Sequence, residues 1–168
     1  MCLIRDQGDA MRRTKGFSLI ELLIVVAIIL IIAAIAVPSF LRSRIAANES
    51  AAVASVRTLN TAQISYNSAY PTVGFASTLG ALAGTSCTPP DSSSACLIDT
   101  QLAAGLKSGY TFTLSSVTGT PSSAYNVVAT PALVNASGIR YFCSYADAVV
   151  RVSATAITTC DNSITPSQ

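Results

Sequence analysis

The sequence predicts an α+β fold in which one long, kinked N-terminal helix packs on a small antiparallel β-sheet. Three observations support this prediction. An apolar run whose only polar members are Ser18 and Glu21 covers residues 17–37. A helical pattern of apolar residues continues to about Tyr66, and segments that alternate apolar and polar residues occupy the last third of the chain. A sheet laid on the amphipathic half of the helix would bury the apolar faces of both.

The long helix is expected to run from Phe17 to about Tyr66, a length on the order of 75 Å. Pro38 lies within it. Because the helical pattern resumes after this proline, we expect a kink there rather than an end. Tyr70-Pro71 and Gly74 then supply stop signals. The half-buried face is defined by residues at helical spacing, namely Ile45, Ala52, Val56, Leu59, Gln63 and Tyr66.

The remaining elements follow the helix in a simple order. Residues 71–96 are rich in Gly, Pro, Ser and Thr and are expected to form a surface loop. A short helix is expected within residues 97–106, closed by Gly105 or Gly109. Short turns between the strand segments favour an antiparallel meander. The four expected strands are residues 110–115, 125–130, 139–145 and 149–154.

The apolar run is long enough to cross a membrane. Its 21 residues, at about 1.5 Å each, span roughly the 30 Å hydrocarbon core of a bilayer. Arg12, Arg13 and Lys15 precede the run, and the first charge after Glu21 is Arg42. The positive-inside rule therefore places the N-terminus in the cytoplasm and predicts that the rest of the chain is exported.

Glu21 is the one charged residue inside this run, and a carboxylate in such a helix costs several kcal/mol unless it has a partner. Three interpretations compete. A secretory signal cut after Ala36 would have an unusually long apolar region that contains an acid. A plain membrane anchor leaves Glu21 unexplained. Cleavage after Gly16 keeps the helix and creates an amine at Phe17, one turn from Glu21. In a helical filament this amine could pair with Glu21 of a neighbouring copy and set the axial register.

Residues 15–28, Lys-Gly-Phe-Ser-Leu-Ile-Glu-Leu-Leu-Ile-Val-Val-Ala-Ile, resemble the prepilin signal of type IV pilins and type II secretion pseudopilins. The resemblance extends over about residues 12–45. It implies the type IV pilin fold, cleavage between Gly16 and Phe17 by a prepilin peptidase, and N-methylation of Phe17. It also implies assembly through Phe17, Glu21 and Pro38 into a homo-oligomeric helical filament, with the inner-membrane assembly machinery and the membrane itself as further partners.

Later segments are similar to the G-type major pseudopilins. They are Tyr66 to Gly74-Phe75, Gly109-Tyr110-Thr111-Phe112 and Gly138-Ile139-Arg140-Tyr141-Phe142. The chain departs from that pattern at Asp147-Ala148, where the turn glycine is absent. It also departs at the C-terminal acids, which that subgroup usually clusters around calcium, whereas Asp147 and Asp161 stand apart here. We therefore expect no metal site.

The expected division of the chain has four parts. Residues 1–16 form the leader peptide, or 11–16 if translation begins at Met11. Residues 17–38 form the transmembrane and filament-core half of the helix, and residues 39–68 form its amphipathic half. Residues 69–168 form the globular head, with a loop, an antiparallel sheet and a disulfide-bounded C-terminal region.

The cysteines fit an exported chain. Cys2 belongs to the leader, and four cysteines lie outside it, where an oxidising compartment favours disulfides over free thiols. Four cysteines allow three pairings. We expect Cys87–Cys96 and Cys143–Cys160, because each pair brackets a loop and closes few residues. A zinc site is disfavoured, since there is no C-x-x-C spacing and no histidine.

Charge and composition exclude several classes of function. Outside the leader, six basic and six acidic side chains balance, so nucleic acid is not indicated as a partner. The chain has no histidine and no paired carboxylates, so no base-oriented nucleophile suggests an enzyme, and no cofactor is expected.

The favoured function is a structural subunit of a type IV pilus, located in the inner membrane with its head in the periplasm before assembly and in the extracellular filament afterwards. One alternative is the major pseudopilin of a type II secretion system. An alternative of a different class is a membrane-anchored or secreted binding domain, cut after Ala36 or not cut. The disulfide-bounded C-terminal region and the few acids favour a pilin, whereas the G-type similarity favours a pseudopilin.

Overall fold

The structure, a computed structural model, describes residues 16–84, 87, 89–116 and 119–167. It divides into an N-terminal unit that ends at Ser39 and a second unit, Phe40–Gln168, which we call the head unit. The long helix α1, Leu19–Ala69, contributes to both. The sequence predicted this helix, and the helix runs through Pro38 without ending there. The bend at Pro38 stays a prediction. The expected leader residues 1–15, with Cys2 and Met11, lie outside the described residues.

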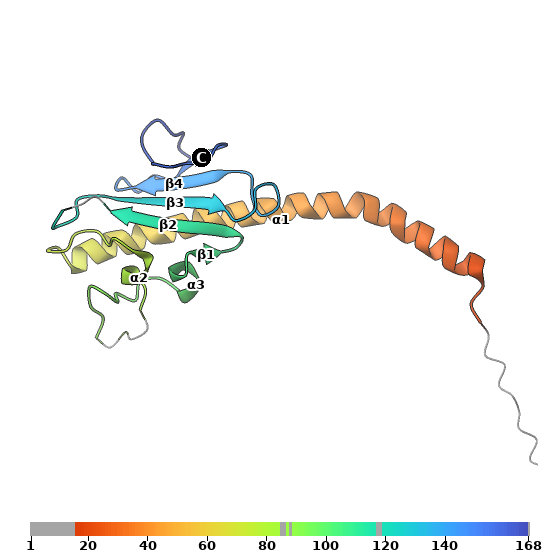
Figure 1. Ribbon diagram of the computed structural model, residues 1–168, viewed down its shortest axis with the longest axis horizontal. Coiled ribbons are helices and arrows are strands. Elements are labelled where there is room, and N and C mark those ends of the chain that lie inside the picture. Colours follow the sequence, from red (N-terminus) through yellow and green to blue (C-terminus); the bar gives the residue numbers. More distant parts are fainter. Residues whose placement is uncertain (1–15, 85–86, 88, 117–118, 168) are drawn as a thin grey trace, which may run out of the picture. The chain divides into compact units, whose positions relative to one another are not determined.

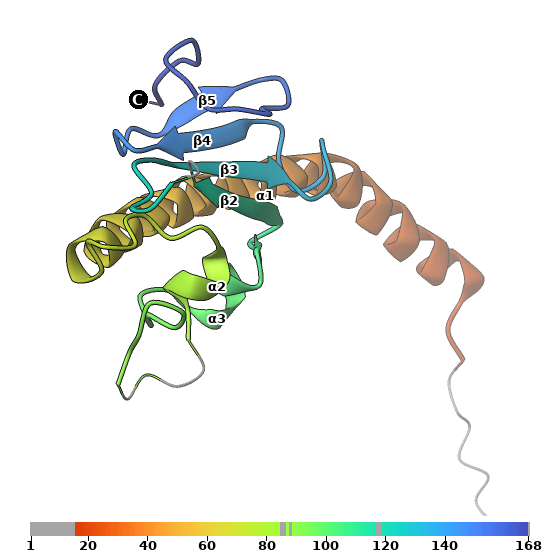
Figure 2. The same cartoon turned by 60° about the vertical axis from the view of Figure 1, so that its left-hand side comes forward.

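The head unit is a five-stranded antiparallel meander laid on the second half of α1 (Figure 1). The strand order follows the sequence: β1 (Leu106–Lys107), β2 (Tyr110–Ser116), β3 (Tyr125–Pro131), β4 (Tyr141–Tyr145) and β5 (Arg151–Ser153). Two one-turn helices, α2 (Leu79–Leu82) and α3 (Thr100–Ala103), lie beside the β1–β2 edge, and β5 forms the other edge (Figure 2). The predicted α+β architecture and the meander are confirmed.

The core forms where the apolar stripe of α1 meets one face of the sheet. Ala52, Val56 and Leu59 are fully buried against the sheet. The alternation in β2 places Tyr110 and Phe112 inside and their neighbours outside, as the sequence predicts. Strand β3 is buried on both faces. Its outer face is covered by the C-terminal segment, because Val128, Cys143 and Cys160 form a second apolar cluster there.

The end of α1 is fixed by a close contact with the loop between β2 and β3. Gly74 has a φ of +84°, and a side chain there would collide with the backbone of Ser122, so only glycine fits. Around it, the Phe75 amide donates to the carbonyl of Ser122 (3.1 Å), and the Ser122 amide donates to the carbonyl of Val73 (2.8 Å). The stop signal at Gly74 therefore also joins the helix end to the sheet.

Around the short helices, the structure corrects one expectation, confirms a short helix closed by Gly105 and adds one strand. Residues 71–96 are not all loop, because Thr78 caps the short helix α2. The helix within residues 97–106 is only the single turn of α3, begun by the side chain of Asp99 and followed by Gly105 at φ +75°. The next two residues pair with β2 as β1, a strand that the sequence analysis did not predict.

Two strands are shorter than predicted because side-chain carboxylates accept hydrogen bonds from backbone amides that would otherwise belong to the strands. The amides of Ile139 and Arg140 donate to Glu49, so β4 begins at Tyr141 rather than at residue 139. The amide of Val149 donates to Asp147 (3.0 Å), and β5 begins at Arg151. The last hairpin forms without a turn glycine, since Ala148 itself adopts a φ of +59°.

Candidate assembly site

The residues predicted to be processed lie just before α1. Gly16 and Phe17 are both exposed and precede the helix, whose first turn includes a bond from the Leu22 amide to the carbonyl of Ser18 (3.2 Å). A Cβ placed on Gly16 would meet no atom within 4 Å among the described residues. The fold itself therefore does not require glycine at this position.

Glu21 lies in the first turn of α1 and is exposed. Its carboxylate is placed favourably toward the positive end of the helix dipole. It forms no salt bridge with any of the described residues, which include three ion pairs elsewhere in the chain. The charge that sequence analysis singled out is thus without a cationic partner in this part of the chain.

The apolar part of α1 is uncovered. Fifteen large apolar side chains between Phe17 and Val37 are 46% to 83% exposed, and the segment is apolar and long enough to cross a membrane. Burying one such side chain contributes about 2 kcal/mol, so full exposure of the segment to water would cost on the order of 30 kcal/mol. That exceeds the whole stability of a typical domain, about 5–15 kcal/mol. The segment must be covered by lipid or by protein.

The end of the head unit nearest Phe40, which we call its base, contains an ion pair between Glu49 and Arg140 that sequence analysis missed. Glu49 is 5% exposed, and its carboxylate accepts hydrogen bonds from the amides of Ile139 (2.9 Å) and Arg140 (3.0 Å). The guanidinium of Arg140 completes the site at 2.7 Å. A signal was present in the sequence, because Glu49 lies three and seven residues before Ala52 and Val56 and hence on the buried stripe of α1.

Hydrogen-bond donors from Ile139 and Arg140 stabilise the ionised form of the Glu49 carboxylate. Burial alone would raise the pKa of Glu49, but the two backbone amides and the Arg140 guanidinium together hold that pKa below its ordinary value of 4.5. Above the ion pair, a shallow surface pocket of about 320 Å³ is lined by Arg42, Ile45, Ala46, Glu49, Ile139 and Arg140. Its walls are mainly apolar, and Arg42 adds a second cation to its rim.

Both expected disulfides are present in the structure, Cys87–Cys96 and Cys143–Cys160, each with 5.8 Å between the Cα atoms. The first closes the loop between α2 and α3, whose Ser92 carbonyl also accepts a hydrogen bond from the Tyr66 hydroxyl (2.6 Å). The second fixes the C-terminal segment over the outer face of β3 and β4. Among the described residues, no group of histidine, cysteine or acidic side chains is arranged to hold a metal ion.

A second unforeseen ion pair holds the C-terminal segment. Arg151 is 4% exposed and bonds the carboxylate of Asp147 at 2.6 Å. The same guanidinium donates to the side chain of Asn162 (3.0 Å) and lies 4.3 Å from the centre of the Tyr145 ring. Asp147 is therefore a structural partner of arginine in this hairpin, and the pKa of its carboxyl is lowered, chiefly by the hydrogen bond from Arg151.

The comparisons with known proteins found similarity to parts of the chain. The family described as the prokaryotic N-terminal methylation motif matches residues 11–37. The type IV major pilin protein PilA of Myxococcus xanthus is 50% identical over 54 residues, which cover 32% of this chain and 24% of that protein. The type IV wide pilus major component PilA4 of Thermus thermophilus is 54% identical over 44 residues, which cover 26% of this chain and 34% of that protein. No solved structure matches the chain significantly.

These matches define the class of the N-terminal segment. Residues 11–37 match the prokaryotic N-terminal methylation motif, and parts of the chain are similar to two type IV pilus proteins. The fold has the long helix and antiparallel sheet that the resemblance to pilins led us to expect. The matched part spans about a quarter to a third of the length of the two relatives.

The first prediction concerns the pH dependence of the head unit. Because the folded pKa of Glu49 lies below its unfolded value, its ionised form stabilises the fold above about pH 4.5, and this contribution is lost as the pH falls through the lowered pKa. Glu49→Gln should lower the free energy of unfolding by about 2 kcal/mol at neutral pH and flatten the acid limb. Thermal unfolding of the detergent-solubilised chain measures both.

Asp161→Asn is the control, because Asp161 is exposed and its carboxylate bonds the neighbouring Ser163. This variant should keep most of the wild-type stability and pH dependence. If Glu49→Gln were as stable as the wild type at pH 7, the role given to this ion pair would be wrong.

Proposed function

We propose that the chain is a structural subunit of a type IV pilus that is cleaved after Gly16 and assembled through its apolar helix. The observation that carries this proposal is an apolar, uncovered helix with one acid, Glu21, inside a segment matched by the methylation motif. Both relatives named above are type IV pilus components by their names, which supports a pilus rather than a secretion pseudopilus.

Processing accounts for Gly16. A Cβ at Gly16 would meet no atom within 4 Å among the described residues, so in this proposal the glycine serves an outside protein that binds the backbone closely at this point. A prepilin peptidase cutting between Gly16 and Phe17 and methylating the new amine would supply that requirement. The proposed leader is residues 1–16, and the proposed membrane and filament-core segment is residues 17–38.

Assembly accounts for Glu21. When helices bundle and exclude water, the carboxylate of Glu21 and the amine of Phe17 are each unfavourable alone and favourable together. Pairing between copies gives a subunit one preferred axial position, because any other position leaves a charge unpaired in a low dielectric. Pro38 would adjust the direction of the helix between this bundle and the head unit.

The proposed location follows from the same features. Before assembly the apolar helix lies in the inner membrane with the head, residues 69–168, on the periplasmic side, where disulfides form. After assembly, other copies replace lipid around residues 17–38, and the amphipathic part, residues 39–68, carries the head outward. The inner-membrane assembly machinery is the expected partner during this transfer.

The second prediction tests the cleavage site. Mass spectrometry of the mature protein should find a chain that begins at methylated Phe17. Gly16→Val should abolish this processing and leave a larger, membrane-bound form, because a branched side chain cannot approach the peptidase as closely. Ser18→Ala, on the other side of the cut, should be processed normally. A mature chain beginning at Val37, as for an ordinary secreted domain, would refute the proposal.

The third prediction separates processing from assembly. Glu21→Gln keeps the shape of the side chain but removes its charge, so cleavage should proceed while the yield of sheared fibres falls by at least about a hundredfold, as for an unpaired buried charge. Glu21→Asp should retain part of the yield. Electron microscopy of the cells and immunoblots of the sheared fraction measure the result. Normal fibres from the Glu21→Gln strain would contradict the pairing argument.

A further inference from the structure

The charged residues of the head unit do not all find partners within it. Three ion pairs are present among the described residues: Glu49 with Arg140, Asp99 with Lys107, and Asp147 with Arg151. Five other charged residues have no salt bridge in the part of the head unit that the structure describes. They are the basic residues Arg42, Arg44 and Arg57 and the acidic residues Asp91 and Asp161. The unmatched cations all lie on α1, and the unmatched anions both lie outside it.

The first of these cations lies at the apolar pocket on the base of the head unit. Arg42 lines the pocket together with Ile45, Ala46 and Ile139. The second guanidinium on the rim, that of Arg140, is already neutralised by Glu49. The pocket thus combines apolar walls with one surplus positive charge, a combination that fits a ligand with an apolar group beside an anion.

Residues 89–94 of the chain itself combine apolar side chains with an anion, and we call this segment the distal turn. Pro89 and Pro90 are exposed and are followed directly by Asp91, whose side chain is also exposed. The turn is held rigid, because Asp91 and Ser94 exchange backbone hydrogen bonds (3.3 and 3.1 Å) and the Asp91 carboxylate accepts from the amide and hydroxyl of Ser93 (2.8 and 2.7 Å). The disulfide Cys87–Cys96 and the bond from Tyr66 to Ser92 anchor it further.

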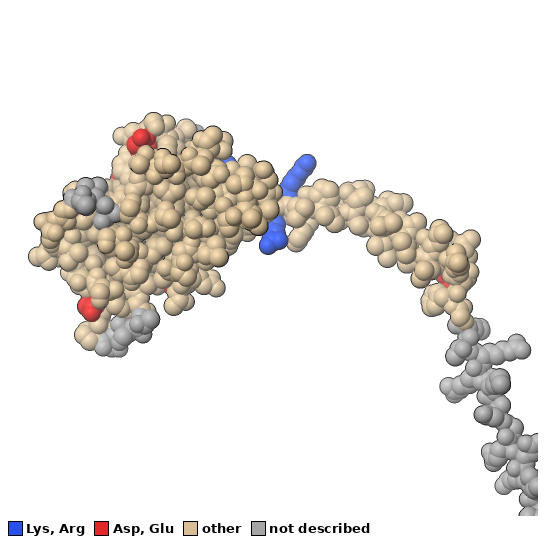
Figure 3. Space-filling view, viewed as in Figure 1, with Lys and Arg blue, Asp and Glu red and all other residues tan. Residues whose placement is uncertain are grey.

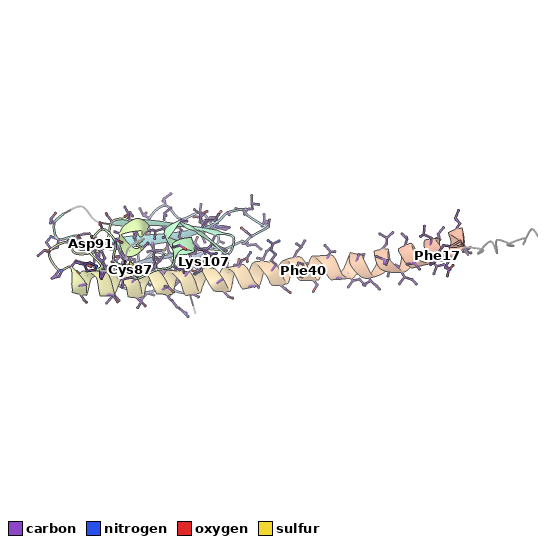
Figure 4. All side chains as sticks on the ribbon, turned by 90° about the horizontal axis from the view of Figure 1, so that it is seen from below. Phe17, Phe40, Cys87, Asp91 and Lys107 are labelled. Atoms are coloured by element: carbon purple, nitrogen blue, oxygen red, sulfur yellow. A yellow bond between two sulfur atoms is a disulfide. The ribbon has the colours of Figure 1, made fainter. Side chains whose placement is uncertain are left out.

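The pocket and the distal turn lie at opposite ends of the head unit. Asp91 and Cys87 are at the end of the head farthest from Phe40, from which α1 leads into the pocket residues (Figure 4). Basic side chains project from α1 at one end of the head unit, and acidic side chains appear toward the other end (Figure 3). The two surfaces therefore cannot meet within one chain, although they are complementary in charge and in apolar character.

We propose that the base pocket of one subunit receives the distal turn, Pro89-Pro90-Asp91, of a second copy, with the Asp91 carboxylate beside the Arg42 guanidinium. This inference rests on the proposed filament function and adds a contact between heads to it. A contact between two different surfaces of the same chain is heterologous, and repeated without closure it generates an open helical filament. The rigid turn favours such a contact, since little conformational freedom is lost on binding.

Other acids of the chain fit this pocket less well. Asp99 and Asp147 are occupied by Lys107 and Arg151. The pKa of Asp161 is lowered chiefly by the hydrogen bonds from Ser163 and to a smaller extent by the charge of Arg151, and its neighbour Cys160 is tied to Cys143. Only Asp91, among the described acids of the head unit, follows two exposed prolines. Asp161 and, on the basic side, Arg57 thus provide matched controls.

A charge-reversal cycle in the full-length chain tests the contact. Arg42→Asp and Asp91→Arg should each lower the yield of sheared fibres by about tenfold or more, because like charges then face each other across the interface. The double variant should return the yield to within about threefold of wild type, as expected for a direct pair. Arg57→Asp and Asp161→Arg should leave the yield near wild type, and Asp161→Arg should not rescue Arg42→Asp. The amount of processed subunit in the membrane is measured in each strain.

A cross-link provides a second measurement that does not depend on how well the charge variants fold. Cysteines placed at Ala46 and Pro90 should join subunits in oxidised fibres and give a ladder on a non-reducing gel, whereas cysteines at Arg57 and Pro90 should not. Unchanged yields in both single charge variants, a double variant as defective as they are, or fibres without the ladder would overturn the proposed contact. Absence of fibres from the wild-type strain would instead refute the proposed function.

Discussion

The apolar first part of α1 has no cover of its own, and most of what the molecule does follows from this constraint. Its exposed side chains from Phe17 to Val37 would cost on the order of 30 kcal/mol in water, which no interaction inside the head could offset. The segment therefore needs lipid or other protein around it, and in the proposed assembly a subunit passes from one to the other with little change in apolar burial. Because apolar contact is not directional, the single carboxylate of Glu21 is the group that supplies specificity in the proposed filament.

The head unit, by contrast, has its own hydrophobic core and internal ion pairs. Its core is shared between the stripe of α1 and one face of the sheet, and the buried Gln63 side chain bonds both the amide and the carbonyl of Ala76 at 2.9 Å. Ion pairs at Glu49 and Arg151 and two disulfides fix the segments that enter and leave the sheet. In the proposed filament, the charges that the described part of the head unit leaves without a salt bridge, such as Arg42 and Asp91, are available to neighbouring subunits.

The sequence predicted the large features well because their signals are local and repeated. The spacing of Ala52, Val56 and Leu59 marked the buried face of α1, and the alternation around Phe112 marked β2. What it missed depends on contacts between residues far apart in the chain. Glu49 meets the amides of Ile139 and Arg140 about ninety residues later, and this contact shortens β4. The hairpin at Ala148 forms because Asp147 binds Arg151 and caps Val149, a substitute for the turn glycine that no local pattern indicates. Within the candidate site, the role of the N-terminal segment was predicted from the sequence, and the match over residues 11–37 supports that interpretation. The ion pair between Glu49 and Arg140 and the pocket beside it were found only in the structure.

The most direct test of this account is the accessibility of the apolar helix in lipid-free fibres. A cysteine at Ile29, in the middle of the apolar segment, should resist a water-soluble maleimide in purified fibres, while a cysteine at Ser50, which is exposed on the same helix, should react. We expect at least about a hundredfold slower labelling at position 29, as for a side chain sealed from water by neighbouring helices. Equal labelling at the two positions, or fibres whose subunits lack residues 17–37, would contradict it.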